Sequence, residues 1–341
     1  MKTSSETDVA LTAWAERVFN SGAVKRTPSR RGMTGLRLAG PNNQSRGLAT
    51  SARTVRSKLA AIVKRTPQVL VRVSGGGRNI RHVKAHLDYI SRNGQITLED
   101  QNGEKINGRD EVAALRDEWQ FGGFPIVDSS NARQAFNIVL SMPAGTDERA
   151  VLDAAREFAA SEFSNHQYAM ALHTFDTDPD KDPSPNPHVH LCVKAMGLDG
   201  VRLNPRKDDL QRWREGFAHH LRERGVEAEA TRRIHRLKRE RGEKQSVRYQ
   251  KARGDVMHSI GRSAANPKRV ANAKRLESDM VTGYREMAKV LAASASPSDR
   301  SLALGIACRV AQPDFFEGAG RQQEIGQQSR RDKREQSKDR P

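Results

Sequence analysis

Four short segments in the first two thirds of the chain have the composition and spacing of β-strands. They span residues 68–73, 136–142, 168–174 and 188–193. In the last of them Val189, Leu191 and Val193 fall on one face, because successive side chains of a strand point to opposite faces. The other face carries two histidines and Cys192. The sequence therefore predicts a strand with one apolar face and one histidine face.

Between these segments apolar residues recur every three or four positions, which predicts amphipathic helices over about 79–92, 147–163 and 208–224. In the first helix Val83, Leu87 and Ile90 form the buried stripe, and Tyr89 lies about 130° away from it. Residues 99–118 contain two Asn-Gly turns and predict a hairpin followed by a short helix. The order of elements predicts an α+β fold, in which helices back a mainly antiparallel sheet.

The chain outside these elements is basic. Among 341 residues there are 59 Lys and Arg against 41 Asp and Glu, a formal net charge of +18, and only 5% aromatic residues. We expect three parts: a largely flexible basic arm over 1–66, the α+β domain over 67–236, and a basic helical and disordered extension over 237–341. The charge excess indicates a polyanionic partner, most simply nucleic acid.

Two features indicate the cellular compartment. No run of 18 apolar residues is present, so no membrane insertion is expected, and the N-terminus lacks the apolar segment of a secretion signal. The two cysteines, Cys192 and Cys308, are far apart and form no disulfide framework. A cytoplasmic location follows as the expectation.

Three histidines are candidates for a metal site. His188 and His190 lie two residues apart on one strand face, and a hairpin between the last two predicted strands would bring His173 beside them. Three neutral nitrogen ligands with open positions are typical of a catalytic site for a divalent ion. Taken alone, two such histidines on a strand are more often incidental than metal-binding. Cys192 shares their face, and we interpret it as a small buried residue.

Three motifs in order resemble the relaxase family of plasmid mobilisation proteins, of the MobP type, in the group that contains the T-DNA border endonuclease. They are HLDYISRNG around Tyr89, LSMPAGTD around Ser141, and HTFDTDPDKDPSPNPHVH, which runs from His173 through His188 to His190. The resemblance covers about residues 68–236. The loop after His173 is longer than the short turn usual in the family, and the strand after the last histidine ends Val-Lys-Ala where the family usually has an asparagine.

The resemblance implies a histidine-hydrophobe-histidine (HUH) endonuclease, or relaxase, fold. It implies that Tyr89 is the nucleophile, that Ser141 positions DNA, and that His173, His188 and His190 hold Mg²⁺ or Mn²⁺. Such an enzyme nicks single-stranded DNA at a transfer origin, with site and strand specificity, and forms a covalent 5′-phosphotyrosyl intermediate during conjugative mobilisation. Accessory mobilisation proteins and a type IV secretion coupling protein are the expected partners.

Several alternatives stay open at this point. Asp176 and Asp178 could orient a metal ligand or accept a proton, or be solvated loop carboxylates. Tyr168, Tyr249 and Tyr284 remain other candidate nucleophiles. A rolling-circle replication initiator shares the HUH chemistry, although in the familiar initiators the tyrosine follows the histidines. A non-enzymatic DNA-binding accessory protein would need only the positive charge.

Overall fold

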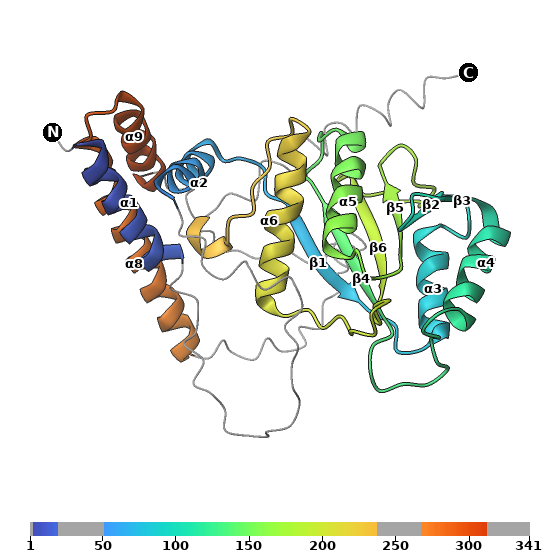
Figure 1. Ribbon diagram of the computed structural model, residues 1–341. Helices are drawn as coiled ribbons and strands as arrows, with labels where there is room; N and C mark the ends of the chain where they lie inside the picture. The colour runs from blue at the N-terminus through green and yellow to red at the C-terminus, as the bar shows by residue number, and fades with distance from the viewer. Residues whose placement is uncertain (1–2, 20–50, 237–266, 312–341) are drawn as a thin grey trace, which may run out of the picture. The chain divides into compact units, whose positions relative to one another are not determined.

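The computed structural model describes residues 3–19, 51–236 and 267–311 (Figure 1). The chain divides into two compact units, each described by itself below. The first, residues 66–230, is called the sheet unit. The second, made of residues 1–65 and 231–341, is called the helical unit. Among the described residues, no helix is long and apolar enough to cross a membrane.

The sheet unit is built on six strands in the order β1-β4-β6-β5-β2-β3, and every neighbouring pair is antiparallel. The strands are β1 (Leu70–Gly75), β2 (Leu98–Asp100), β3 (Lys105–Ile106), β4 (Ala135–Ser141), β5 (Tyr168–His173) and β6 (His188–Lys194). The prediction of an α+β fold with a mainly antiparallel sheet is confirmed. The first strand starts two residues later than predicted, since Gln68 instead forms an isolated bridge with Glu229.

Helices pack on both faces of this sheet (Figure 1). On one face, α5 (Glu148–Glu162) and α6 (Lys207–Glu223) cover an apolar core that includes Val71, Ile138 and Leu191. On the other, α3 (Ile80–Ile90) and α4 (Gly108–Phe121) cover a second core that includes Ala135, Ala169, Ala171 and Cys192. The alternation of side chains along each strand sends these two sets of residues to opposite layers.

Local sequence signals set the starts of two helices of the sheet unit. Asn79 caps α3, with its side chain accepting a hydrogen bond from the backbone N–H of His82, and Asp147 caps α5 in the same way through Arg149. Gly145, just before this second helix, has φ of +84°, which a glycine adopts without strain. These caps satisfy backbone donors that a helix leaves free at its start.

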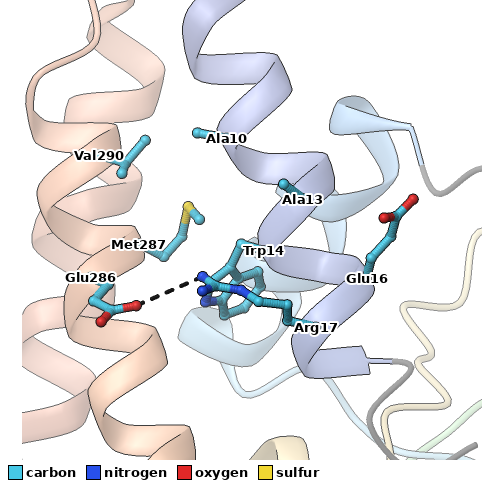
Figure 2. Close-up of a pocket in the computed structure, with 8 residues that line it drawn as sticks. All are labelled: Ala10, Ala13, Trp14, Glu16, Arg17, Glu286, Met287 and Val290. Carbon is cyan, nitrogen blue, oxygen red and sulfur yellow. Dashed lines mark ion pairs between the residues drawn. The ribbon is translucent and has the colours of Figure 1, made fainter.

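The helical unit contains α1 (Ser4–Phe19), α2 (Ala52–Lys64), α8 (Pro267–Ala292) and α9 (Pro297–Ala311), with a short 3₁₀ helix η1 (Arg233–Arg236). The four α-helices share one apolar cluster, formed by residues such as Leu11, Trp14, Val55, Leu59, Tyr284, Met287 and Ile306. A hollow between α1 and α8 is lined by apolar side chains that include Ala10 and Val290, and the ion pair of Arg17 with Glu286 crosses it at 3.8 Å (Figure 2).

This cluster differs from the expectation of a separate flexible arm over 1–66. Val55, Leu59 and Ile62 recur at intervals of four and three residues, so α2 has a narrow apolar stripe between basic residues. That stripe packs with the C-terminal helices. The exact boundaries at 66 and 236 remain predictions, and residues 20–50, 237–266 and 312–341, which contain much of the predicted basic segments, lie outside the described chain.

Arg56 joins three helices of this unit through ion pairs with two carboxylates. Arg56 of α2 donates two hydrogen bonds to the Asp299 carboxylate of α9, at 2.7 and 3.0 Å, and pairs with Asp8 of α1 at 2.7 Å. Asp299 is 2% exposed. The Arg56 guanidinium holds the pKa of the Asp299 carboxyl below its usual range, against the opposite effect of burial.

Replacing Arg56 should therefore destabilise the helical unit. We expect Arg56→Met to lower the free energy of unfolding by about 3 kcal/mol near neutral pH, because Asp299 would stay buried without its cation. The difference in unfolding free energy between wild type and variant should persist above the ordinary carboxyl pKa, near 4. It should shrink as the pH falls through the lower pKa that Asp299 has in the folded state. Urea unfolding followed by circular dichroism at neutral and acid pH checks this. The exposed Arg53→Met on the same helix is the control.

Candidate metal centre and nucleophile

The register of three strands places the candidate residues in two rows on one face of the sheet. In the first row His188 of β6 lies between His173 of β5 and Ser141 of β4. In the second row His190 is opposite Ala171 on one side and Val139 on the other. Directly opposed residues share a face. The predicted hairpin therefore does bring His173 to the other two histidines, despite the longer loop.

The three imidazoles form one cluster. Their ring centroids are separated by 5.3 Å for His173 and His188, 4.7 Å for His173 and His190, and 5.0 Å for His188 and His190. One nitrogen from each lies within 4.8 Å of the others. His173 and His190 are buried and His188 is partly buried. Such an arrangement can hold one ion between three nitrogens.

The surroundings keep two of these imidazoles neutral. Burial lowers the pKa of His190 to about 2, and electrostatic repulsion from the neighbouring imidazoles adds to this effect. Burial also lowers the pKa of His188, against the opposite effect of its hydrogen bond to the Asn186 carbonyl. A neutral imidazole retains the lone pair with which a histidine binds a metal.

His173 has both ring nitrogens engaged with oxygen atoms. Its Nδ1 lies 2.9 Å from Oδ2 of Asp178, and its Nε2 lies 2.7 Å from the backbone carbonyl of Ile90. The contact with the carboxylate has the form of the outer partners that orient metal-binding histidines. The carbonyl contact occupies the other nitrogen, which must leave Ile90 before it can bind an ion.

The nitrogen atoms of the three histidines fit a divalent ion, provided that Nε2 of His173 leaves the Ile90 carbonyl. Nδ1 of His190 is buried and has no hydrogen-bond partner within the described part of the chain, and such an atom is costly unless something binds it. Nδ1 of His188 contacts the Asn186 carbonyl, which leaves its Nε2 for a ligand. The set contains nitrogen only, and imidazole suits a first-row transition ion better than Mg²⁺.

Tyr89 lies beside this cluster. It projects from α3 away from the buried stripe, as predicted, and is 51% exposed. Its ring meets the ring of His190 edge-on, with centroids 5.6 Å apart. The His86 ring lies nearly parallel to it at 6.1 Å, and the Arg92 guanidinium lies 4.8 Å from its centroid. An exposed phenol next to a candidate metal centre is placed to react with a bound phosphate.

Arg92 connects the tyrosine to the histidines. Its guanidinium donates two hydrogen bonds of 2.8 Å to Asp178, the residue that contacts His173, and lies 3.3 Å from Asp180. The hydrogen bonds to Asp178 raise the pKa of Arg92 further, so it stays charged. It holds φ of +50° where the chain leaves α3, which directs its side chain back over the Tyr89 ring. One cation thus contacts both the phenol ring and the carboxylate behind a candidate ligand.

The other tyrosines are placed differently. Tyr168 is buried in the apolar core under α5 and α6, on the sheet face away from the histidines. Tyr284 is buried in the helical unit, where its hydroxyl donates to the carbonyl of His235. Tyr249 lies outside the described residues. Among the described tyrosines, Tyr89 alone has both an exposed ring and a position beside the three imidazoles.

The structure also sorts the remaining predicted residues. Ser141 is partly exposed and lies in the same row as His188. Of the two candidate acids, Asp178 contacts His173, and Asp176 is exposed. Sequence reasoning missed His86 and Arg92. His86 lies three residues before Tyr89 on α3, and residues at that spacing are neighbours on a helix surface, so its spacing was a usable signal. Arg92 lies beyond the end of α3, so helix spacing gave no signal for it.

Comparison with known proteins finds similarity over part of the chain. Residues 90–226 match the family model for relaxases, described as the MobA/VirD2-like nuclease domain. This segment of the chain is similar to the nuclease domain of relaxases. Ser141 and all three clustered histidines fall inside the matched segment, which begins directly after Tyr89.

One protein similar to this chain is the T-DNA border endonuclease VirD2 of Rhizobium radiobacter, 29% identical over 122 residues. That alignment covers 31% of this chain and 28% of VirD2, so the chain spans less than a third of the relative's length. A structure from work on the molecular basis of vancomycin resistance transfer in Staphylococcus aureus is 15% identical, with a TM-score of 0.31, and covers 49% of this chain and 99% of its own.

Proposed function

We propose that this protein is a relaxase that nicks single-stranded DNA at a transfer origin, with site and strand specificity, and holds the cut strand covalently on Tyr89. The observation that carries the proposal is the exposed Tyr89 ring, packed edge-on against His190 of the three-histidine cluster. The match of residues 90–226 to a relaxase nuclease domain supports the same reaction class.

In the proposed reaction the Tyr89 oxygen bonds to the phosphorus of the scissile phosphodiester, and the bond from phosphorus to the 3′-oxygen breaks. The phenol loses its proton to solvent, and the departing 3′-oxygen takes one up. The products are a 5′-phosphotyrosine and a free 3′-hydroxyl. One phosphate ester replaces another, so the same groups can run the reaction backward and rejoin a strand.

The residues around Tyr89 have separate roles in this scheme. Arg92 fixes the ring and brings positive charge next to it, while Asp178 orients His173. Ser141, beside His188, is placed to position the DNA strand. A divalent ion held by His173, His188 and His190 would neutralise charge on the scissile phosphate as a Lewis acid. Mn²⁺ and Mg²⁺ are the ions to test for this role.

The wider setting follows from charge and family. The net charge of +18 supplies attraction for the phosphates of a DNA strand, and the protein would act in the cytoplasm. Accessory mobilisation proteins would select the origin, and a type IV secretion coupling protein would pass the bound strand on. A rolling-circle initiator is the second candidate for the shared chemistry, but the matched family model is that of relaxases.

A direct test is to incubate the protein with labelled single-stranded oligonucleotides from candidate transfer origins, with Mn²⁺ or Mg²⁺. We expect a covalent protein–DNA band that survives denaturing electrophoresis, together with a shorter product that bears a 3′-hydroxyl. Tight binding without a covalent band at any origin sequence would instead support a DNA-binding accessory protein.

A further inference from the structure

The histidine face of the sheet is covered on one side only. On this face α3 packs on β5 and β6, the strands that carry the histidines. The helix α6 packs closely on β1, but from the opposite face of the sheet. On the histidine face of β1 the side chains of Leu70, Arg72 and Ser74 are all exposed, and Leu70 is 47% exposed. The sheet surface beside the three imidazoles is thus open on the β1 side.

Register places Arg72 in line with a candidate metal ligand. Arg72 is opposite Val139 of β4, and Val139 is opposite His190 of β6. Directly opposed residues point to the same face, so the guanidinium stands on the histidine face two strands from the cluster, or about 10 Å between backbones. Long side chains reach beyond their direct neighbours at such spacings.

The Arg72 side chain is exposed on β1. Within the described part of the chain its side chain forms neither an ion pair nor a hydrogen bond. The side chains on the open part of this face contain no carboxylate: they are Leu70, Arg72, Ser74, Asn137, Val139 and Ser141. Two other arginines on this side of the sheet are held by acids, Arg92 by Asp178 and Arg116 by Asp88. An unpaired arginine on an open polar surface is suited to a phosphate.

We propose that Arg72 binds a backbone phosphate of the DNA strand, on the open part of the histidine face between β1 and the three imidazoles. This inference rests on the proposed function, because it needs a single DNA strand that passes the three histidines. It adds that the strand runs from the histidines toward β1. Because the contact is to the sugar-phosphate backbone of the DNA, it contributes to affinity and to the position of the strand but does not recognise a base.

The test is a binding titration that involves no chemistry. Anisotropy of a fluorescein-labelled oligo(dT) of about 20 nucleotides is measured over a range of NaCl concentrations, with EDTA present to prevent cleavage. Each phosphate contact on a single strand contributes about 0.7 to the slope of log affinity against log salt. We expect Arg72→Gln to reduce that slope by about 0.7 and Arg72→Lys to retain it, because a lysine still neutralises a phosphate.

Arg149→Gln is the matched control. Arg149 is exposed on α5, in the layer on the opposite face of the sheet, and its loss removes the same single charge. The control should keep the wild-type slope. If the wild type binds the oligonucleotide and Arg72→Gln keeps the full slope, Arg72 makes no phosphate contact, while the proposed function stands. If the wild type fails to bind single-stranded DNA at all, the proposed function is wrong and this inference fails with it.

Discussion

Tyr89→Phe should abolish the covalent protein–DNA band and reduce nicking by at least about 10³-fold, as loss of a nucleophile does in other enzymes. The phenyl ring keeps the packing against His190 and the position under Arg92, and only the hydroxyl is removed. DNA affinity should therefore stay within a few-fold of the wild type. Denaturing electrophoresis of the adduct, with anisotropy for binding, measures both quantities on the same preparations.

Tyr249→Phe is the matched control and should react like the wild type. The decisive contrary result is a Tyr89→Phe protein that still forms the adduct while Tyr249→Phe does not, which would move the nucleophile to Tyr249. Tyr168 and Tyr284 make poor comparisons because both are buried, so their replacement disturbs packing.

His188→Ala and His190→Ala should each eliminate cleavage and weaken Mn²⁺ binding by more than about 100-fold, since even the loss of an outer partner costs 10- to 100-fold. DNA binding should change little, because phosphate contacts elsewhere supply most of it. Calorimetric titration of the metal-free protein with Mn²⁺ gives the affinity, and cleavage of an origin oligonucleotide gives the activity. His173→Ala should be partly rescued by excess Mn²⁺, because its Nε2 also has the Ile90 carbonyl as a partner.

His82→Ala, on the exposed side of α3, removes an imidazole outside the cluster and should behave like the wild type. EDTA should stop wild-type cleavage without releasing the oligonucleotide. Cleavage that continues unchanged in EDTA, or a metal-free protein that takes up no ion, would refute the metal centre and leave the three histidines as ordinary residues of the sheet.

Much of the sheet unit could be predicted because its signals are local. The alternation around His188 and the stripe of Val83, Leu87 and Ile90 each specify an element and the face it buries. The hairpin that brings in His173 follows from the turn residues between two strands. The partner of each histidine could not be predicted, because contacts such as His173 with the Ile90 carbonyl depend on how α3 lies over β5.

The packing of the helical unit could not be predicted from local sequence. α2 carries four basic residues in 13, so its composition suggests a solvated arm, yet its apolar stripe is buried against helices more than 200 residues away. Nothing near α2 in the sequence indicates that partner. A deletion of residues 1–60 would therefore remove part of this core together with the basic charge. Single charge substitutions outside the apolar stripe are the better test of what the basic residues contribute to DNA binding.

The hydrogen bond between His173 and the Ile90 carbonyl also bears on how tightly the protein keeps its ion. An ion bound through Nε2 of His173 would replace this hydrogen bond, and a typical hydrogen bond is worth about 1 kcal/mol. The apparent affinity would then be about fivefold weaker than three unengaged imidazoles would give. Ile90 directly follows Tyr89, so loading and release of the ion exchange a contact at the end of the nucleophile's own helix. We expect a centre that releases its ion readily, and in which ion occupancy is thermodynamically linked to the position of Tyr89.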